Sequence, residues 1–330
     1  MLTLPDFRYK QIAFHIAGGS REKLKFRADN IVIEDESGKV ILQHSCHRLF
    51  ALFIVGETTL TTPVMRYAVQ YGFPIIIMNR NMKVVARINS AAEGNTLLRE
   101  KQYFLSRETQ LEIAKKLIRL KINNQKKLIS QLRYLSVTDK EIKEELENCK
   151  TDSASDLNEL RGIEGYASKL FFSAYFRPLN WIRREPRCKR DISNLLLDIG
   201  YTYLFNFLEG MLSLYGFDLY SGVMHSFFYQ RKSLVCDLIE PFRCIIDRRL
   251  RKAHNLNQIS EKDFFFRDHR CNLEWKQQQK YIRLFMKDIL EEKEKIFLFC
   301  QAYYRWFIKS RSLDSFPEYS INGDLENSDP

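Results

Sequence analysis

The stretch from Ser221 to Arg249 combines residue types that can hold a metal cation beside a polyanion. It contains His225 and a pair of carboxylates, Asp237 and Glu240, that lie three residues apart, with Asp247 further along. On a helix, residues at i and i+3 share a face, so the two carboxylates can converge on a single ion. Basic residues flank this acidic pair on both sides, namely Arg231, Lys232, Arg243, Arg248 and Arg249. Acid surrounded by base predicts a site for a metal ion and a polyanion together.

The candidate ligand set is Glu164, His225 and Glu240, with Asp237 as a fourth ligand or as a carboxylate that orients one of the others. Carboxylate oxygens with a single imidazole favour Mg²⁺ or Mn²⁺ over structural zinc. On a phosphodiester such an ion neutralises the non-bridging oxygens, positions the nucleophile and stabilises the leaving 3′ oxygen. Glu164 lies far from His225 in the chain, and no spacing rule brings the two together.

Structural roles for the same residues stay open. Asp237 can cap a helix or pair with Arg243, and Glu240 can pair with a basic residue one turn away. A histidine near aromatic residues is often a hydrogen-bonded core residue. Pro241 lacks an N–H and crowds the preceding turn, so a helix here either starts just before Pro241 or kinks there. Either outcome leaves irregular backbone beside Glu240, which suits a functional site.

Other candidate sites are weaker. The cluster from His44 to His47 is dense in histidine and cysteine, but it has no second pair of ligands and does not predict a zinc site. The same holds for Asp268, His269 and Cys271. The chain has no P-loop, no HExxH sequence and no dinucleotide-binding glycine pattern.

The charge of the chain points to an anionic partner. The 330 residues carry a formal net charge of +11 at a pI near 9.2, with 45% hydrophobic and 28% charged residues. The segment from Ser312 to Pro330 holds five acidic residues and no basic ones, so the preceding residues sit near +16, which is +11 plus 5. Such an excess indicates nucleic acid or an acidic membrane surface, or a solvated basic surface without a partner.

Cysteine usage and hydropathy bear on the compartment. The seven cysteines form no CxxC pair and are odd in number, which favours a reducing cytosol over a disulfide framework. The N-terminus lacks a basic region followed by an apolar one, and no run of about 18 apolar residues occurs. We therefore expect a soluble cytoplasmic protein without a membrane partner.

Residues 1–89 read as a small β-rich domain. Alternation predicts strands over Tyr9–Ile16, Leu24–Ile33 and Val40–Gln43, and a turn at residues 35–38 joins the last two. Short apolar runs at Leu49–Val55 and Pro74–Met78 are typical of buried strands. Further elements are a short helix opened by Thr62-Pro63 and closed by Gly72, and a last strand over Val84–Asn89.

After a linker at residues 90–95, helical periodicity dominates, so residues 96–311 are predicted to form a larger all-α domain. The fold class is therefore α+β. Glycines at 162 and 165 place Glu164 at a loop-to-helix junction, residues 194–215 form a core helix, and residues 264–273 add a small hairpin or loop. Residues 277–307 read as one or two amphipathic helices, and residues 312–330 as a flexible acidic tail.

Two helical segments are strongly basic. Lys115–Arg133 holds seven Lys or Arg and no acid, which suits either a packed helix with a solvated basic back or contact with DNA. Arg177–Arg190 holds six basic residues against one acid, with Trp181 among them. Aromatic rings among cations suit nucleic acid, because the ring stacks on bases while the cations meet phosphates.

The motifs resemble those of a known family, the CRISPR-associated integrase that inserts new spacers into the repeat array. The sequence GIEGYASKLFF at 162–172 resembles the family's glutamate motif. GVMHSFFYQRKSLVCDLIEPFR at 222–243 resembles its histidine and acidic motif. GNTLLREKQY at 94–103 and the segment from Asn194 to Tyr201 also fit the family, and the resemblance spans roughly residues 5 to 310.

The resemblance implies a β-rich N-terminal domain followed by an α-helical catalytic domain. It also implies a homodimer that assembles with a small ferredoxin-like partner protein around double-stranded DNA, both the prespacer and the CRISPR repeat. The family's metal ligands carry over to Glu164, His225 and Glu240, with Asp237 as the neighbouring acid and Mg²⁺ or Mn²⁺ as the ion. The third ligand is Glu240 here, where the family often has Asp.

The implied reaction is a metal-dependent transesterification, in which a DNA 3′-hydroxyl attacks a phosphodiester in the repeat. Alternatives are an inactive DNA-binding scaffold of the same fold, against which the intact ligand set argues, and a general DNA repair nuclease. The residues that we expect to contact DNA are Arg99, Arg183, Arg184, Arg231, Lys232, Arg243 and Arg248.

Overall fold

The computed structural model describes residues 4–17, 21–79, 84–88, 95–225 and 228–323. It forms two compact units, Met1–Arg99 with Glu209–Phe217, and Glu100–Leu208 with Asp218–Pro330. The first unit is rich in β-strands and the second is mainly helical, which confirms the predicted α+β class. Residues 90–94 of the predicted linker lie outside the described residues, so that boundary stays a prediction.

The first unit contains two four-stranded sheets. In one, β1, β5 and β7 run parallel and β8 is antiparallel to β7, in the order β1-β5-β7-β8. In the other, the order is β4-β3-β2-β6. The strands are β1 Gln11–Ile16, β2 Lys23–Arg27, β3 Asn30–Glu34, β4 Val40–Ser45, β5 Leu49–Val55, β6 Thr59–Leu60, β7 Ile75–Met78 and β8 Val84–Ile88.

One hydrophobic core lies between these sheets. All seven residues of β5 are buried, because this apolar strand is central in its sheet. Side chains of β1, β2, β3 and β7 join the same core, together with Val64 and Ala68 of α2 (Thr62–Tyr71). Helix α2 ends at Tyr71 as predicted, and Gly72, which has a left-handed φ of 74°, is its C-cap residue. Thr61, one residue before the expected threonine, is its N-cap residue.

Two expectations for this unit were wrong. The alternating segment from Leu24 to Ile33 is two antiparallel strands, because the chain turns back at Ala28 and Asp29 with φ of 45° and 57°. Two successive residues with positive φ give a turn whose twist matches the strands on either side. Residues before β1 form a short helix, α1 (Leu4–Tyr9), although the predicted strand began at Tyr9.

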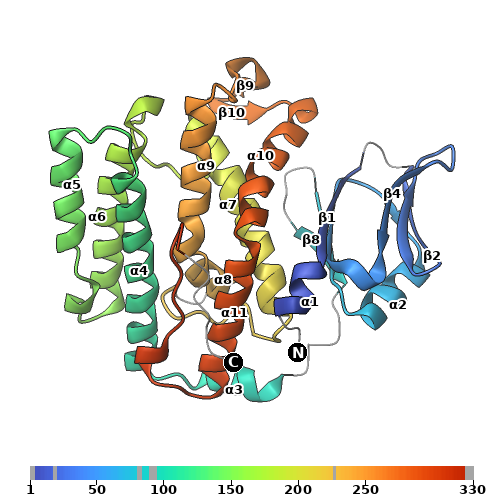
Figure 1. Cartoon of the computed structure of the whole chain (residues 1–330), viewed down its shortest axis with the longest axis horizontal. Helices are drawn as coiled ribbons and strands as arrows, with labels where there is room; N and C mark the ends of the chain where they lie inside the picture. The colour runs from blue at the N-terminus through green and yellow to red at the C-terminus, as the bar shows by residue number, and fades with distance from the viewer. Residues whose placement is uncertain (1–3, 18–20, 80–83, 89–94, 226–227, 324–330) are drawn as a thin grey trace. The chain divides into compact units, whose positions relative to one another are not determined.

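The second unit is built mainly from helices (Figure 1). Helix α4 packs against α5, α6 and α9, and it also contacts the short 3₁₀ turn η5 that carries Glu240. The helices are α3 Thr96–Tyr103, which crosses from the first unit, α4 Arg107–Ser130, α5 Val137–Asn148, α6 Leu157–Tyr175, α7 Ile192–Ser213, α8 Ser233–Leu238, α9 Arg243–Asn255, α10 Gln278–Glu291 and α11 Lys293–Ile308. The 3₁₀ turn η5 covers Glu240–Phe242. The predicted hairpin is present as β9 Phe264–Arg267 and β10 Arg270–Leu273.

The C-terminal segment, residues 313–323, differs from the flexible tail that was predicted. Phe316, Tyr319 and Ile321 are buried. The Tyr319 ring lies 4.5 Å from that of Phe242, measured between centroids. The expectation failed because it followed the charge of the stretch, in which Asp314 and Glu318 are acidic and no residue is basic, while its apolar side chains pack against the helical unit. Residues 324–330 lie outside the described part of the chain.

Within the described residues, no helix is both long enough and apolar enough to span a bilayer. The longest, α4, has 24 residues, but many of them are charged.

Candidate functional site

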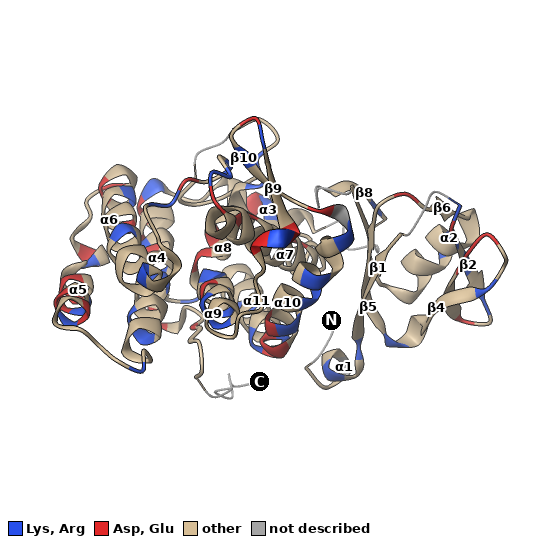
Figure 2. Cartoon of the chain, turned by 90° about the horizontal axis from the view of Figure 1, so that it is seen from above, with Lys and Arg blue, Asp and Glu red and all other residues tan. Residues whose placement is uncertain are grey.

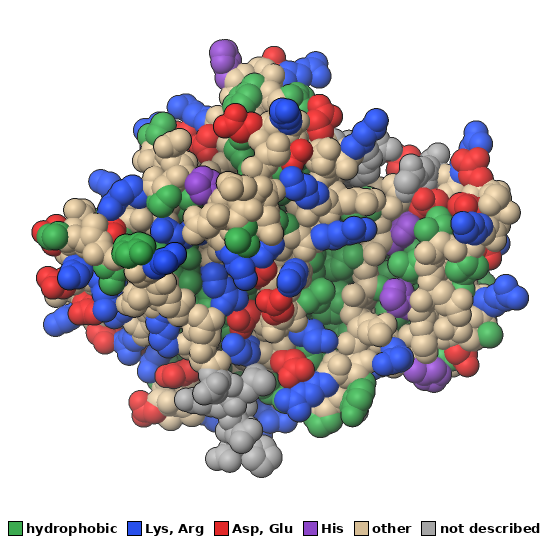
Figure 3. All heavy atoms as spheres, turned by 45° about the horizontal axis from the view of Figure 1, so that its top comes forward, with side chains coloured by type: hydrophobic (Ala, Val, Ile, Leu, Met, Phe, Trp, Pro, Cys, Tyr) green, Lys and Arg blue, Asp and Glu red, His purple; other side chains and the backbone are tan. Residues whose placement is uncertain are grey.

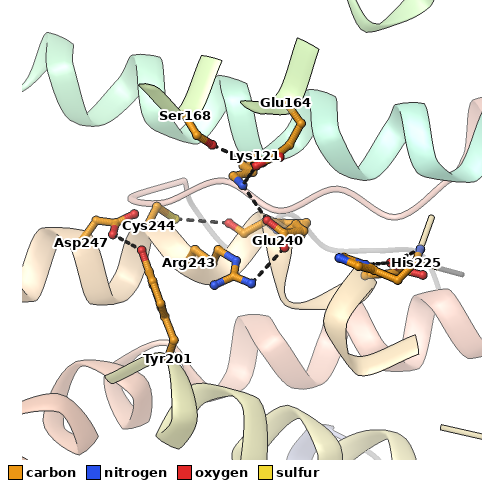
Figure 4. Close-up of polar contacts among 11 residues, drawn as sticks. Lys121, Glu164, Ser168, Tyr201, His225, Glu240, Arg243, Cys244 and Asp247 are labelled. Atoms are coloured by element: carbon orange, nitrogen blue, oxygen red, sulfur yellow. Dashed lines mark hydrogen bonds and ion pairs between the residues drawn. The ribbon is translucent and has the colours of Figure 1, made fainter. Parts of the chain in front are cut away.

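Lys121 lies between the carboxylates of Glu164 and Glu240 (Figure 4). Its Nζ donates a hydrogen bond to Oε1 of Glu164, and another to Oε2 of Glu240 at 2.7 Å. The three side chains come from α4, α6 and η5, which are far apart in the sequence. The exposed fractions are 9% for the lysine side chain, 6% for that of Glu240 and 25% for that of Glu164. Two of the three predicted ligands therefore share one cation, and that cation is a side chain.

The local charges keep this cluster ionised. Burial opposes the charged form of Glu240, but the positive charges of Arg243 and Lys121 outweigh it and lower the pKa of Glu240 to about 2. For Lys121, burial favours the neutral amine, yet the charges of Glu240 and Glu164 raise its pKa above the usual value. The cluster is therefore a set of paired ions at neutral pH.

Arg243 anchors Glu240 from the other side. Its guanidinium contacts Oε1 of Glu240 at 3.0 Å and lies over the ring of Tyr201, 4.7 Å from the centroid. The Tyr201 hydroxyl donates to Oδ1 of Asp247 at 2.5 Å. Burial is the main reason why the pKa of Asp247 is raised to about 7. Glu240 is thus fixed by two cations, one of which rests on an aromatic ring in the interior.

His225 is oriented by Asp237. Its Nδ1 lies 2.5 Å from Oδ1 of Asp237, and its backbone N–H donates to the same oxygen at 3.1 Å. The other oxygen accepts the backbone N–H groups of Val223 at 2.6 Å and Met224 at 3.0 Å. Metal-ligating histidines usually bind a carboxylate or carbonyl through their other ring nitrogen, and the contact of Nδ1 with Asp237 leaves Nε2 available for such a role. Asp237 therefore acts on His225 and on the loop before it.

The structure distinguishes between the two roles left open for Asp237 and corrects the predicted place of Glu164. Asp237 and Glu240 do not converge on one ion but bind different partners, and Asp237 has the orienting role. The α-helical backbone of α8 ends at Leu238, and Glu240 begins a 3₁₀ turn with Pro241 in it, as the interruption predicted at that proline requires. Glu164 was expected at a loop-to-helix junction, but it lies inside α6.

Two polar residues of the site, Lys121 and Asn124, were missed by the sequence reasoning. Both are buried on the face of α4 that also carries Leu117 and Leu128. Asn124 donates to the carbonyls of Pro241 at 3.1 Å and Tyr319 at 3.3 Å. All four residues follow one helical stripe, so a lysine and an asparagine within an apolar stripe were a readable signal. The basic composition of the segment concealed it.

The residue types at this site suit a divalent metal ion, but their present positions do not form a complete metal site. Among the residues that the structure describes, no group of three or more His, Cys, Asp or Glu side chains is placed to hold a metal ion. Two carboxylates nevertheless converge on one cation, and the nearby imidazole is held by a carboxylate in the way that metal-ligating histidines are. The set would suit Mg²⁺ or Mn²⁺ once the ammonium group of Lys121 had moved away.

The arginines expected at DNA have varied surroundings. Arg99 donates to the carbonyl of Gly216, and Arg184 to Asn194 and Asp198. The guanidinium group of Arg243 contacts Glu240, and that of Arg248 contacts Glu292 and Asn322. The exposed Arg183 pairs with Glu185. Arg231 and Lys232 are partly buried just before α8. In Figure 2, Lys and Arg mark the ribbons of α4 and α9, among other elements. Contact of these residues with DNA stays a prediction.

The chain matches a family model and is similar in sequence to known proteins. The family model described as CRISPR associated protein Cas1 matches residues 18–287. A CRISPR-associated endonuclease Cas1 of Thermodesulfovibrio yellowstonii is 30% identical over 276 residues, which cover 74% of this chain and 86% of the relative.

Solved structures with low sequence identity share the fold. One chain of a Cas6-RT-Cas1–Cas2 complex superposes with a TM-score of 0.77 at 18% identity, covering 94% of this chain and 36% of that longer one. A casposase bound to an integration product superposes with a TM-score of 0.76 at 19% identity, covering 95% of each chain.

Proposed function

This chain belongs to the CRISPR-associated Cas1 family, and we propose that it is a metal-dependent DNA integrase and endonuclease of CRISPR adaptation. The observation that carries this proposal is the convergence of Glu164 and Glu240 on one buried cation beside the carboxylate-bound His225. Carboxylates from separate elements that converge on one position can hold a divalent ion, and such an ion suits phosphodiester chemistry. An intact set of candidate ligands argues against a catalytically inactive scaffold.

The proposed reaction exchanges one phosphodiester bond for another. The oxygen of a DNA 3′-hydroxyl forms a bond to a phosphorus atom of the repeat strand, and the bond from that phosphorus to the strand's own 3′ oxygen breaks. The attacking hydroxyl gives up its proton and the leaving 3′ oxygen takes one up. When water attacks instead, the same steps amount to endonuclease cleavage.

The chain's own residues have distinct roles in this proposal. Glu164, Glu240 and His225 would hold Mg²⁺ or Mn²⁺, and Asp237 orients the imidazole of His225. When bound, the ion supplies charge neutralisation at the phosphate and at the leaving oxygen. Arg243 keeps Glu240 ionised and in place.

The proposed partners follow from charge and from relatives. The net charge of +11 suits DNA, and Figure 3 shows many Lys and Arg side chains on the face that it presents, with Asp and Glu among them. A chain of similar fold was solved in a complex that includes Cas2, and another on an integration product. We extend these cases to prespacer and repeat DNA, a small ferredoxin-like partner and a homodimer, working in the cytoplasm.

A strand-transfer assay tests the proposed reaction. Labelled prespacer duplex is incubated with repeat DNA with and without Mn²⁺, using the wild type, Glu164→Ala and Glu240→Ala. Product should require the metal and disappear in both variants. The matched control is Glu159→Ala, since Glu159 lies on the same helix as Glu164 and its carboxylate accepts from the backbone N–H and the hydroxyl of Ser155. Undiminished activity in the first two variants would refute the site.

A salt titration tests the basic surface separately. Each phosphate neutralised by Lys or Arg makes the logarithm of the binding constant fall with a slope of about 0.9 per logarithm of salt concentration. Binding of a fluorescent duplex should therefore weaken steeply between low and physiological salt. A flat profile would contradict the phosphate-contact interpretation without touching the metal site.

A further inference from the structure

We propose that Lys121 is an internal cation that holds Glu164 and Glu240 together until a divalent metal ion takes its place. The inference rests on the proposed metal-dependent function. It adds that the ammonium group of Lys121 occupies the site before a divalent metal ion binds. In this view, Lys121 positions the metal ligands and also competes with the metal.

The geometry makes the two cations alternatives. The Nζ of Lys121 lies within hydrogen-bonding distance of one oxygen on each glutamate, so it occupies the space that an ion shared by both would need. Figure 4 shows the three groups in line, with His225 beside Glu240. The position between the two carboxylates can hold either a metal ion or the ammonium group of Lys121, but not both at once.

The charge balance leads to the same conclusion. Glu164 and Glu240 contribute two negative charges, and Lys121 and Arg243 contribute two positive ones. The cluster is thus neutral without a metal. A divalent ion added to it would raise its charge to +2 among largely buried groups, and departure of one side-chain cation lowers that excess to +1. Arg243 is held against Tyr201, whereas a lysine ends a flexible four-carbon chain. Lys121 is therefore the cation that leaves.

Lys121 stabilises the two glutamates in the absence of metal, and it also hinders metal binding. Without Lys121, the carboxylate of Glu240, whose side chain is 6% exposed, would lack one of its two counter-charges and would repel Glu164. With Lys121, the ligands stay together but the metal binds only after the ammonium has moved. The apparent affinity for metal is then lowered by the fraction of molecules in which the site is open.

Metal titration of Lys121→Met tests the competition. Mn²⁺ binding is followed by electron paramagnetic resonance of the free ion, for the wild type, Lys121→Met and Lys115→Met. Lys115 is the matched control, since it lies on the same helix, has an 11% exposed side chain and pairs with Glu112 away from the site. We expect Lys121→Met to bind Mn²⁺ about tenfold more tightly than the wild type, as removal of a competing state predicts. Lys115→Met should match the wild type.

The outcomes separate this inference from the proposed function. If Glu164→Gln binds Mn²⁺ as well as the wild type does, the proposed metal site is wrong. If that variant loses the ion while Lys121→Met binds it equally or more weakly than the wild type, the site stands and the competition is refuted.

A second measurement covers the case in which Lys121→Met does not fold. In the wild type, amine-reactive labelling of Lys121 is compared with that of Lys115 by mass spectrometry, with and without Mn²⁺. Release of the ammonium group from the two carboxylates should raise the labelling of Lys121 relative to Lys115. An unchanged ratio at saturating Mn²⁺ would overturn the proposal.

Discussion

Asp237 holds His225 at two points, because one carboxylate oxygen contacts both the Nδ1 and the backbone N–H of the histidine. The second oxygen accepts two further backbone N–H groups from the loop that precedes His225. The orientation of the imidazole and the shape of its loop therefore depend on one buried carboxylate. An aspartate can do this because an ionised carboxylate offers acceptors only.

Asp237→Asn should damage metal binding more than folding. The amide keeps one acceptor oxygen and replaces the other with a donor that would face an N–H group. Loss of such an orienting group typically costs about 10–100-fold in metal affinity. Mn²⁺ titration measures this loss, and urea unfolding measures stability. Asp218→Asn, in the same region but bound to Tyr103 and Tyr220, should keep the wild-type affinity. Equal affinities in all three proteins would contradict the assigned role.

Gly222→Ala should act through the same carboxylate. An added Cβ at this position would lie 2.5 Å from Oδ2 of Asp237 and 2.7 Å from backbone of Ser233, so the acid or the loop must move. We expect lower metal affinity and lower strand-transfer activity. Gly162→Ala is the control, since a Cβ there meets nothing within 4 Å and lies inside α6. Alanine in a helix interior should stabilise that variant by up to about 1 kcal/mol.

Tyr319→Ala should destabilise the protein substantially. The side chain is 5% exposed, its ring packs on Phe242, and its backbone carbonyl accepts from Asn124. Removing a large buried aromatic side chain costs about 3–5 kcal/mol. Urea unfolding measures the change, with Tyr134→Ala as a control because that side chain is 78% exposed. A change as small as that of the control would restore the interpretation of this segment as a flexible tail.

Asp247 should make stability depend on pH. Burial raises its pKa from 3.8 to about 7, so its folded pKa lies above the unfolded one. The contribution of Asp247 is therefore fully present at low pH and is lost as pH rises, by up to about 1.4 kcal/mol per unit between about pH 4 and 7. Asp247→Asn should lose this part of the slope. Urea unfolding across that pH range measures the dependence of the unfolding free energy on pH. The exposed Asp152→Asn is the control. The same pH dependence in the wild type and in Asp247→Asn would contradict the prediction.

Most of the elements could be predicted from local patterns. The strand from Leu49 to Val55 is a run of apolar residues, and α2 has proline near its start and Gly72 at its end. Pro241 indicated the break beside Glu240. The split at Ala28 and Asp29 was missed because that turn lacks the glycine or asparagine that usually marks two residues with positive φ.

The site was only partly predictable, for a physical reason. The motifs nominate Glu164, His225 and Glu240, but which side chains meet depends on helix packing rather than on spacing. Lys121 reaches Glu240 across a long stretch of sequence, and nothing local to either residue indicates the pairing. The different partners of Asp237 and Glu240 follow from a change of backbone geometry between α8 and η5.

The bonds of Asn124 also bear on the order in which the site can form during protein synthesis. Asn124 links the carbonyl of Pro241, next to Glu240, to the carbonyl of Tyr319 and the N–H of Ile321. A ribosome makes Glu164, His225 and Glu240 well before it makes Ile321. The turn that carries Glu240 therefore gains its full support only after Ile321 has been translated, so a nascent chain that has just passed Glu240 still lacks the hydrogen bonds that brace the proposed metal site.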